Sequence, residues 1–404
     1  MARNLKSPAA GTRKICKLPR YALIGWMPIR TKLVLLVACL PIVVAGCHDR
    51  VSPDLSNPSA GNTSACRPLA SVVGPEDFAV DKYGGRLLVS SRDRRNPSLE
   101  GAIYSVSLDG SSNRRLSLAG RDSCSFRPHG VFLASTTPPT LYVINYHKAE
   151  DASADAGCVQ ATTGFPEPIV SIEVFAVFRW ELRFLRRLMH PAILKNANDL
   201  VADDEGNVYI TAPPRGVAGL LRDLTAKETG SSEVVEFRCQ PGSVGWDCIG
   251  QWSNVATVGR YVNGIALLQE GSETRLVVSS TLDGRLVQLR RTNGAWQFES
   301  LRRFGIGHDN LMWLDEEPHT LLVASHPDLR RFSQHSHSSR VTSPSLVWKV
   351  PLDGPGSEAL VFSDDGTMIS AASTAACVGD SLILGQVFGG SVLKCKRPDI
   401  CGPR

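Results

Sequence analysis

The stretch Asn196-Ala-Asn-Asp-Leu200 places two amides and a carboxylate directly before a run of apolar residues. Similar stretches recur about 45 to 70 residues apart, and each puts an acid, an amide or a histidine where a buried strand is about to begin. The other four are Gly74-Pro-Glu-Asp-Phe78, Arg127-Pro-His-Gly-Val131, Tyr261-Val-Asn-Gly-Ile265 and Gly307-His-Asp-Asn-Leu311. Side chains spaced this widely cannot meet along one helix or hairpin. They meet if each opens the innermost strand of a repeated β unit arranged around an axis, as in a β-propeller. Calcium prefers such Glu, Asp and Asn oxygens.

The body of the chain consists almost wholly of strand-like units. Short apolar runs rich in β-branched residues follow turn signals at 86–91, 140–145, 207–211, 275–280 and 320–325. Most are followed by a second strand with polar alternation, and a sixth copy spans 375–394. The sequence therefore predicts an all-β fold, a six-bladed propeller over residues 65–397, with a C-terminal tail at 398–404. Residues 178–190 are the one stretch with helix-like character, and a strand with its connection fits them equally well.

Residues 1–46 have the pattern of an export signal. Residues 33–44 are apolar and short for a membrane span, and they follow Arg30 and Lys32. The run ends in Val44-Ala-Gly-Cys47, and small residues before a cysteine are typical of a bacterial lipoprotein signal. We therefore expect cleavage before Cys47 and lipid attachment to that residue. An uncleaved N-terminal anchor is the alternative.

The leader also bears on the start of the chain, the location and the charge. A true start at Met27 would give the basic segment a more usual length, and residues 47–64 read as a flexible tether. We therefore expect the protein in the bacterial cell envelope, lipid-anchored to the membrane at the periplasmic face. The net charge of the chain is +5, and the leader holds eight Lys or Arg and no acids, so the mature chain carries about −3. The mature chain therefore has no excess of basic residues that would bind nucleic acid. We expect the protein to be a monomer.

Cysteine usage agrees with export. Cys66 and Cys395 lie at the two ends of the folded part, where a disulfide would join the first and last blades. Cys239 and Cys248 flank a turn-rich segment and predict a local bridge. The pairing of Cys124, Cys158, Cys377 and Cys401 stays open. A zinc site is disfavoured because no paired Cys-x-x-Cys spacing is present.

Between Cys66 and Cys395 the chain resembles the paraoxonases, which are calcium-dependent lactonases and arylesterases built as six-bladed propellers. The motifs that carry the resemblance, in order, are Gly74-Pro-Glu-Asp, Ser125-Phe-Arg-Pro-His-Gly130, Ser171-Ile-Glu-Val-Phe175, Asn198-Asp-Leu-Val-Ala202, Val262-Asn-Gly264, Asp309-Asn310, Ser325-His-Pro327 and Ser373-Thr-Ala375. Their order and spacing carry more weight than any one motif.

The resemblance implies two calcium ions in the central tunnel, one catalytic and one structural. It assigns the catalytic ion to Glu76, Asn198, Asn263, Asp309 and Asn310, and the structural ion to Asp77, Asp199 and the backbone carbonyl of Val131. The residues themselves agree, because two adjacent side chains at a strand entrance point opposite ways and can serve two ions. The alternative is that these Asp and Asn residues are only turn formers that bond their own backbone.

The resemblance also implies that His129 accepts a proton from the attacking water and that His326 lies in the same cavity. The family's second histidine falls at Tyr146 here, and the neighbouring His147 substitutes for it only if the strand ends or bulges there. The sequence therefore predicts a calcium-dependent hydrolase acting on a small lactone or aryl ester. A gluconolactonase-type metal enzyme and a non-catalytic propeller that binds another envelope component are the alternatives. A serine hydrolase is disfavoured because Gly-x-Ser-x-Gly is missing.

Overall fold

The structure is a computed structural model that describes residues 66–148, 151, 169–190, 193, 196–214, 231–240, 245–271, 273–353 and 358–402. The chain divides into two units, 1–51 and 52–404, and every described residue belongs to the second. The predicted leader with Met27, the tether, Cys47 and Cys158 lie outside the described residues.

Six sheets of mainly antiparallel strands make up the described fold, numbered here as blades 1 to 6 in chain order. Blade 1 holds β2 (Pro75–Asp81), β3 (Arg86–Ser91), β4 (Ala102–Ser107) and β5 (Asn113–Arg115). Blade 2 holds β7 (Pro128–Ala134), β8 (Thr140–Tyr146), β9 (Val170–Val177) and β10 (Glu181–Leu188), and β6 (Ser117–Ala119) joins β10 in parallel. Blade 3 holds β11 (Leu200–Ala202), β12 (Val208–Ala212), β13 (Glu233–Cys239) and β14 (Gly250–Thr257).

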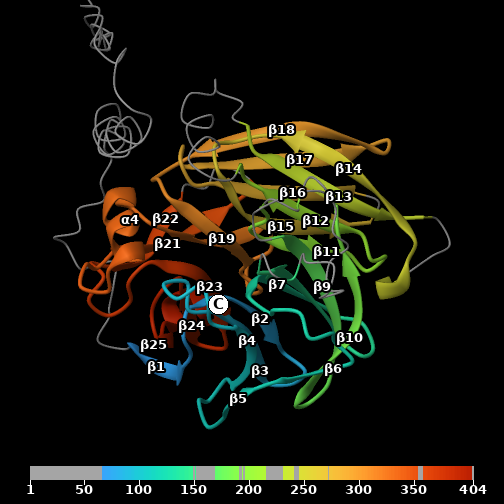
Figure 1. The fold of residues 1–404 in the computed structure, drawn as a ribbon. Helices are drawn as coiled ribbons and strands as arrows, with labels where there is room; N and C mark the ends of the chain where they lie inside the picture. The colour runs from blue at the N-terminus through green and yellow to red at the C-terminus, as the bar shows by residue number, and fades with distance from the viewer. Residues whose placement is uncertain are drawn as a thin grey trace, which may run out of the picture. The chain divides into compact units, whose positions relative to one another are not determined.

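Blades 4 to 6 repeat the same order. Blade 4 holds β15 (Val262–Glu270), β16 (Glu273–Ser280), β17 (Arg285–Thr292) and β18 (Ala295–Arg303). Blade 5 holds β19 (His308–Trp313), β20 (Thr320–Ser325), β21 (Ser345–Pro351) and β22 (Ala359–Asp364). Blade 6 holds β23 (Ala372–Val378), β24 (Ser381–Gln386), β25 (Ser391–Lys396) and β1 (Cys66–Ser71). Figure 1 shows the first strand of each blade toward the middle of the ring. The predicted six-bladed propeller is confirmed.

Apolar side chains pack between neighbouring blades rather than in one central core. The six hydrophobic clusters of the described residues each join two adjacent blades. Strand β3 shows how this works, because Leu87 belongs to the cluster with blade 6 and Leu88 to the cluster with blade 2. Successive strand residues point to opposite faces, so a strand covered on both faces needs a continuous apolar run. The apolar runs seen in the sequence are these second strands.

The ring closes through the N-terminal strand. Strand β1 pairs antiparallel with β25, with Cys66 opposite Cys395, and a disulfide joins these two residues. The predicted closing disulfide is thus confirmed. A second bridge joins Cys239 to Cys248 across the turn after β13. A third, Cys377 to Cys401, was left open by the sequence and ties the helix α5 (Pro398–Cys401) to β23.

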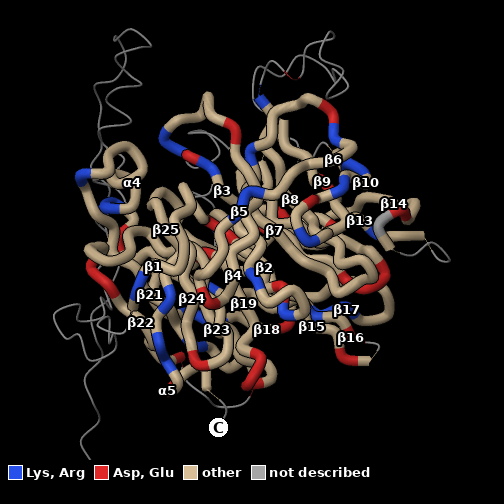
Figure 2. Tube along the Cα trace, turned by 90° about the horizontal axis from the view of Figure 1, so that it is seen from below, with Lys and Arg blue, Asp and Glu red and all other residues tan. Residues whose placement is uncertain are grey.

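Helical structure is sparse in the described residues. Residues 178–190 contain strand β10, so the strand alternative for that stretch is the correct one. Helix α4 (Leu329–His337) follows β20 and begins where the Asp328 side chain accepts a hydrogen bond from the Arg331 backbone N–H. A 3₁₀ turn, η4, spans Gly245–Asp247. None of the described helices is long and apolar enough to cross a membrane. Figure 2 shows acidic and basic residues interspersed over the strands and loops.

Candidate functional site

The five predicted strand entrances and a sixth one meet at the axis, and a local irregularity shapes them. In β2, β7, β15, β19 and β23 the pairing register shifts within the first residues of the strand, as in a β-bulge. In blade 3 the two residues before β11 bond the end of β12 instead, through Asn198 N–H to the Thr211 carbonyl and Thr211 N–H to the Asp199 carbonyl. A bulge leaves residues unpaired and re-aims their side chains. Each entrance therefore brings two adjacent residues to the axis.

These residues form two sets, which we call the first ring and the second ring. The first ring contains Glu76, His129, Asn198, Asn263, Asp309 and Ser373. The second ring contains the residue that follows each of these, namely Asp77, Gly130, Asp199, Gly264, Asn310 and Thr374. Every predicted metal ligand except Val131 is a member of one of the two rings, and Val131 follows Gly130 in the chain.

The second ring alternates carboxylates with glycines between blades 1 and 4. One Asp77 carboxylate oxygen accepts the Val131 N–H of blade 2 at 2.8 Å, and one Asp199 oxygen accepts the Ile265 N–H of blade 4 at 3.0 Å. A side chain at Gly264 would place its Cβ 2.6 Å from the Asn310 Cα, so the next blade approaches too closely for any other residue. The contact of Val131 with this ring is made by its N–H, and a role for its carbonyl stays a prediction.

Burial sets the electrostatics of both rings. Glu76, Asp77, Asp199 and Asp309 are each at most 5% exposed. Burial raises the pKa of Glu76 to about 7 and that of Asp199 to about 8. Burial, together with the charges of Asp199 and Glu76, raises the pKa of Asp77 well above its ordinary value. Several carboxyl groups close together and away from water favour binding of a cation that neutralises them.

Three asparagines of the rings have side-chain oxygens that make no hydrogen bond. The Oδ1 atoms of Asn198, Asn263 and Asn310 are buried and have no partner among the described residues. An unsatisfied buried acceptor is costly and rare in folded proteins. Carbonyl-type oxygens beside carboxylates are the donor set that a hard cation such as calcium takes. The residues present therefore fit a calcium ion.

The donor set is mixed, and its acids are spread over several blades. No group of three or more His, Cys, Asp or Glu side chains among the described residues is close enough together to hold a metal by itself. The rings differ from such a group because asparagine oxygens supply part of the set. The inference of a cation site rests on the unpartnered asparagine oxygens and the buried acids together.

Glu76 lies at the centre of the contacts of the first ring. One of its carboxylate oxygens lies 3.2 Å from Arg94 Nη2 and 3.3 Å from His129 Nδ1. The other accepts a hydrogen bond from Asn310 Nδ2 at 3.3 Å. The Ser373 hydroxyl donates to the Glu76 carbonyl, and the Ser279 hydroxyl of blade 4 likewise donates to the Asp309 carbonyl at 2.7 Å. Hydroxyls on neighbouring strands thus hold the entrances in place.

His129 is the histidine of the first ring, and its side chain is 16% exposed. Arg94 Nη2 lies 2.8 Å from its Nδ1, and the Tyr146 ring packs edge-on against the imidazole at 5.5 Å between centroids. Burial and the positive charges of Arg94 and Arg92 hold the pKa of His129 well below its ordinary value. The imidazole is therefore neutral at neutral pH.

The other two predicted histidines lie in different surroundings. His326 belongs to the site, because its Nε2 lies 2.6 Å from a carboxylate oxygen of Asp309 and its ring stacks on Phe332 of α4. His147 is completely buried, with its Nε2 2.8 Å from the Ser171 hydroxyl and 3.8 Å from Glu173. At the position next to His129 the structure places Tyr146, whose hydroxyl lies 2.6 Å from both Asn196 Oδ1 and the Ala197 carbonyl. The structure thus brings His129 and His326 to the rings and does not bring His147 there.

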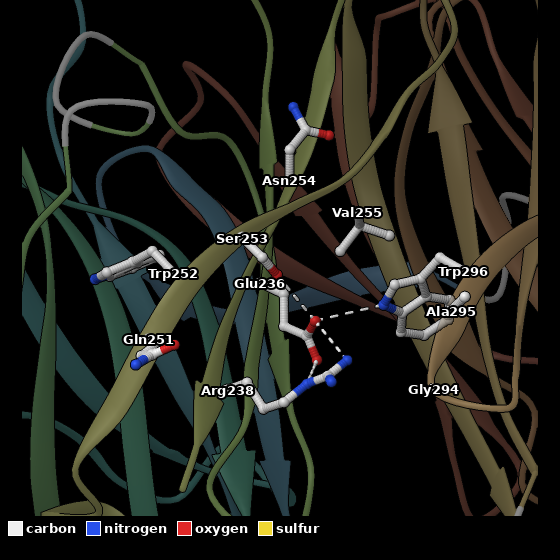
Figure 3. Close-up of a pocket in the computed structure, with 10 residues that line it drawn as sticks. All are labelled: Glu236, Arg238, Gln251, Trp252, Ser253, Asn254, Val255, Gly294, Ala295 and Trp296. Atoms are coloured by element: carbon white, nitrogen blue, oxygen red, sulfur yellow. Dashed lines mark hydrogen bonds and ion pairs between the residues drawn. The ribbon is translucent and has the colours of Figure 1, made fainter.

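Two cavities border the described strands. A cavity of about 290 Å³ is lined by Asp77, Asp199 and Asn310 of the second ring and, further along the same strands, by apolar residues such as Leu267 and Trp313. A larger one of about 430 Å³ lies between the outer strands of blades 3 and 4, where Figure 3 shows Glu236 bonded to Arg238, Ser253 and Trp296. The carboxylate of Glu236 already has hydrogen-bond partners there. The cavity at the second ring is therefore the better candidate for binding a ligand.

The sequence pattern did not reveal every residue of the site. Arg94 contacts Glu76 and His129 although it lies in the connection between β3 and β4, outside any strand entrance. Thr211 and Ser279 also contact the site, through hydrogen bonds to the carbonyls of Asn263 and Asp309. Each lies at the end of an apolar second strand, and this position could have identified them in the sequence.

The likeness of this chain to known proteins lies in structure and not in sequence. No protein-family model matches this chain, and no curated protein is similar to it in sequence. Among solved structures, a luciferin-regenerating enzyme is similar with a TM-score of 0.50 and 11% identity, over 83% of this chain and 96% of that chain. A gluconolactonase from Xanthomonas campestris is similar with a TM-score of 0.48 and 15% identity, over 82% of this chain and 89% of that chain. At 11% identity the likeness to the luciferin-regenerating enzyme concerns the fold alone.

Proposed function

We propose that this protein is a calcium-dependent hydrolase of lactones or aryl esters whose reaction takes place at the first ring. The observation that carries the proposal is the set of three buried asparagine oxygens without hydrogen-bond partners, beside the buried carboxylates of Glu76 and Asp309. Turn-forming residues would use these oxygens to bond their own backbone. Oxygens that are held at the axis without a partner are instead typical of a cation site.

The proposed catalytic ion would take four ligands from the first ring and one, Asn310, from the second. Glu76, Asn198, Asn263, Asp309 and Asn310 would hold the catalytic ion, and Asp77, Asp199 and the Val131 carbonyl would hold the structural one. A calcium ion held by these residues would supply positive charge that polarises a substrate carbonyl and favours its attack by water.

His129 is the proposed base for the attacking water. A guanidinium has only N–H donors, so the 2.8 Å contact from Arg94 Nη2 makes His129 Nδ1 an acceptor and places the imidazole proton on Nε2. If Arg94 moves away from Nδ1, Nδ1–H donates to Glu76 instead, and the Nε2 lone pair is left to accept a proton. The proposed role requires this second arrangement. His326 would position Asp309 through its Nε2–H.

Two alternatives remain as proposals. A gluconolactonase-type enzyme would use the same cation with a sugar lactone as substrate. A non-catalytic, calcium-stabilised propeller is favoured by one observation, because Tyr146 occupies the place of a second histidine and its hydroxyl is bonded to Asn196 and Ala197. A substrate panel that includes a sugar lactone, a γ- or δ-lactone and phenyl acetate separates these functions.

We also propose a lipid anchor on Cys47, export to the periplasmic face and a monomeric state.

The test is hydrolysis of that panel by the purified protein in calcium and in excess chelator. We expect activity in calcium only, and a loss of about 100-fold or more for Glu76→Gln and Asn263→Ala, because each removes one oxygen that stabilises the transition state through the cation. Glu205→Gln is the matched control, since Glu205 is an exposed loop acid away from the rings. A folded, calcium-loaded protein that is inactive on the whole panel would contradict catalysis and leave the scaffold proposal.

A further inference from the structure

The first ring contains a positive charge of its own. Arg94 reaches the ring from the connection between β3 and β4, and its side chain is 11% exposed. Its Nη2 contacts Glu76 at 3.2 Å and His129 at 2.8 Å. Its Nη1 lies 3.2 Å from the Gly74 carbonyl and 3.4 Å from the Val387 carbonyl. The guanidinium is therefore held in place by backbone oxygens while it pairs with a predicted ligand of the catalytic ion.

Within the described part of the chain, the carboxylates of Asp77 and Asp199 are in no ion pair. Asp77 accepts the backbone N–H groups of Phe78 and Val131. Asp199 accepts the backbone N–H groups of Leu200 and Ile265. Among the described residues, the hydrogen bonds to these two carboxylates come from uncharged donors, whereas Glu76 is in an ion pair. The two rings thus offer a divalent cation unequal electrostatic surroundings.

We propose that Arg94 competes with calcium for Glu76 and thereby lowers the affinity of the first ring for its ion. This inference rests on the proposed calcium sites. An ion that takes Glu76 as a ligand must displace a charged hydrogen bond and lie close to a guanidinium, and two positive charges a few ångströms apart repel strongly in a buried site. Arg94 is a positioning residue in this account. It makes the filling of the first ring, and with it the reaction, depend on the calcium concentration around the protein.

The test is a calorimetric titration of the chelator-stripped full chain with calcium chloride. We expect two binding steps that differ by about tenfold or more in Kd. Arg94→Gln should tighten the weaker step by about tenfold or more and leave the tighter step within about threefold of its wild-type Kd. Arg95→Gln is the matched control, because it removes the same charge from the next residue, which bonds the carbonyls of His335 and Phe388. It should leave both steps unchanged.

A second variant keeps the test decisive if Arg94→Gln does not fold. Glu76→Gln should abolish the weaker step and spare the tighter one. The inference is overturned if Arg94→Gln leaves the weaker step unchanged or weakens it, if Arg95→Gln reproduces its effect, or if Glu76→Gln abolishes the tighter step. Equal binding by wild type and Arg94→Gln refutes the competition alone, whereas a wild-type protein that binds no calcium refutes the proposed function as well.

Discussion

At the scale of single residues, the site is decided by how buried polar atoms are satisfied. Most buried side chains near the axis have partners, as Thr211 shows by bonding both the Asp199 and the Asn263 carbonyls. The Oδ1 atoms of Asn198, Asn263 and Asn310 do not. The sequence could predict that these residues gather at an axis, because their spacing matches the blades. It could not predict Arg94, because a residue in a connection carries no periodic signal.

The buried acids give the metal-free protein a distinctive pH dependence. The folded pKa values of Glu76, about 7, and Asp199, about 8, lie above those of the unfolded chain. Folded protein therefore holds protons that unfolded chain releases near pH 4, and this contribution to stability is lost as the pH rises through about 7 to 8. We expect the Tm in chelator to fall by about 5 °C or more between pH 6.5 and 9.

Calcium is the control for that measurement. A bound ion keeps the carboxylates charged in the folded state, so the Tm in calcium should stay nearly constant over the same range. Histidines such as His147, whose pKa is lowered to about 4 by burial, act in the opposite direction, because in the unfolded chain they are still half protonated at pH 6.5. They offset part of the fall in Tm up to about pH 7.5 and add nothing above it. A Tm in chelator that is flat or rising across this range would count against the buried, protonated acids.

At the scale of strands and turns, the β-bulges direct the proposed metal-ligating side chains of each blade toward the axis. Polar residues before an apolar run predicted the entrances, and the alternation of a regular strand predicted two opposite directions. The bulges were not predictable, because they depend on the partner strand as well as on the local sequence. Helix α4 was missed for a related reason, since Leu329 and Phe332 are its only large apolar residues and its packing on His326 is tertiary.

The second-ring glycines test the importance of this geometry. In Gly264→Ala the new Cβ would lie 2.6 Å from Asn310 Cα, so the neighbouring entrance must move. We expect a loss of about 1–3 kcal/mol in the free energy of unfolding and weaker calcium binding. Gly390→Ala is the matched control, because a Cβ there meets nothing within 4 Å. Chemical denaturation of both variants checks this, and equal stabilities would show that the close approach at Gly264 is unimportant.

At the scale of the whole described fold, the rings exist because six blades close on themselves. The six interblade clusters can all form only if β1 completes blade 6, and the Cys66–Cys395 disulfide fixes that pairing. This level was the most predictable from sequence, since repeated strand units and terminal cysteines are visible without tertiary information. The Cys377–Cys401 bridge was not, because four cysteines without spacing constraints allow several pairings.

The closing disulfide should contribute more stability than a local one. It joins residues 329 apart, whereas Cys239 and Cys248 are 9 apart, and a cross-link over a longer loop removes more entropy from the unfolded chain. We expect Cys66→Ser with Cys395→Ser to lose about 3–5 kcal/mol, and Cys239→Ser with Cys248→Ser to lose less. Denaturant unfolding of the two double variants compares them. A larger loss in the local pair would contradict closure by β1 as the critical contact.

The central claim is that the strand entrances hold two cations on the propeller axis. A crystal structure of the full chain grown with calcium, with anomalous scattering recorded, tests it most directly. We expect two anomalous peaks on the axis, one among Glu76, Asn198, Asn263, Asp309 and Asn310 and the other beside Asp77 and Asp199. An axis without a peak, with the three asparagine oxygens bonded only to protein or water, would contradict it.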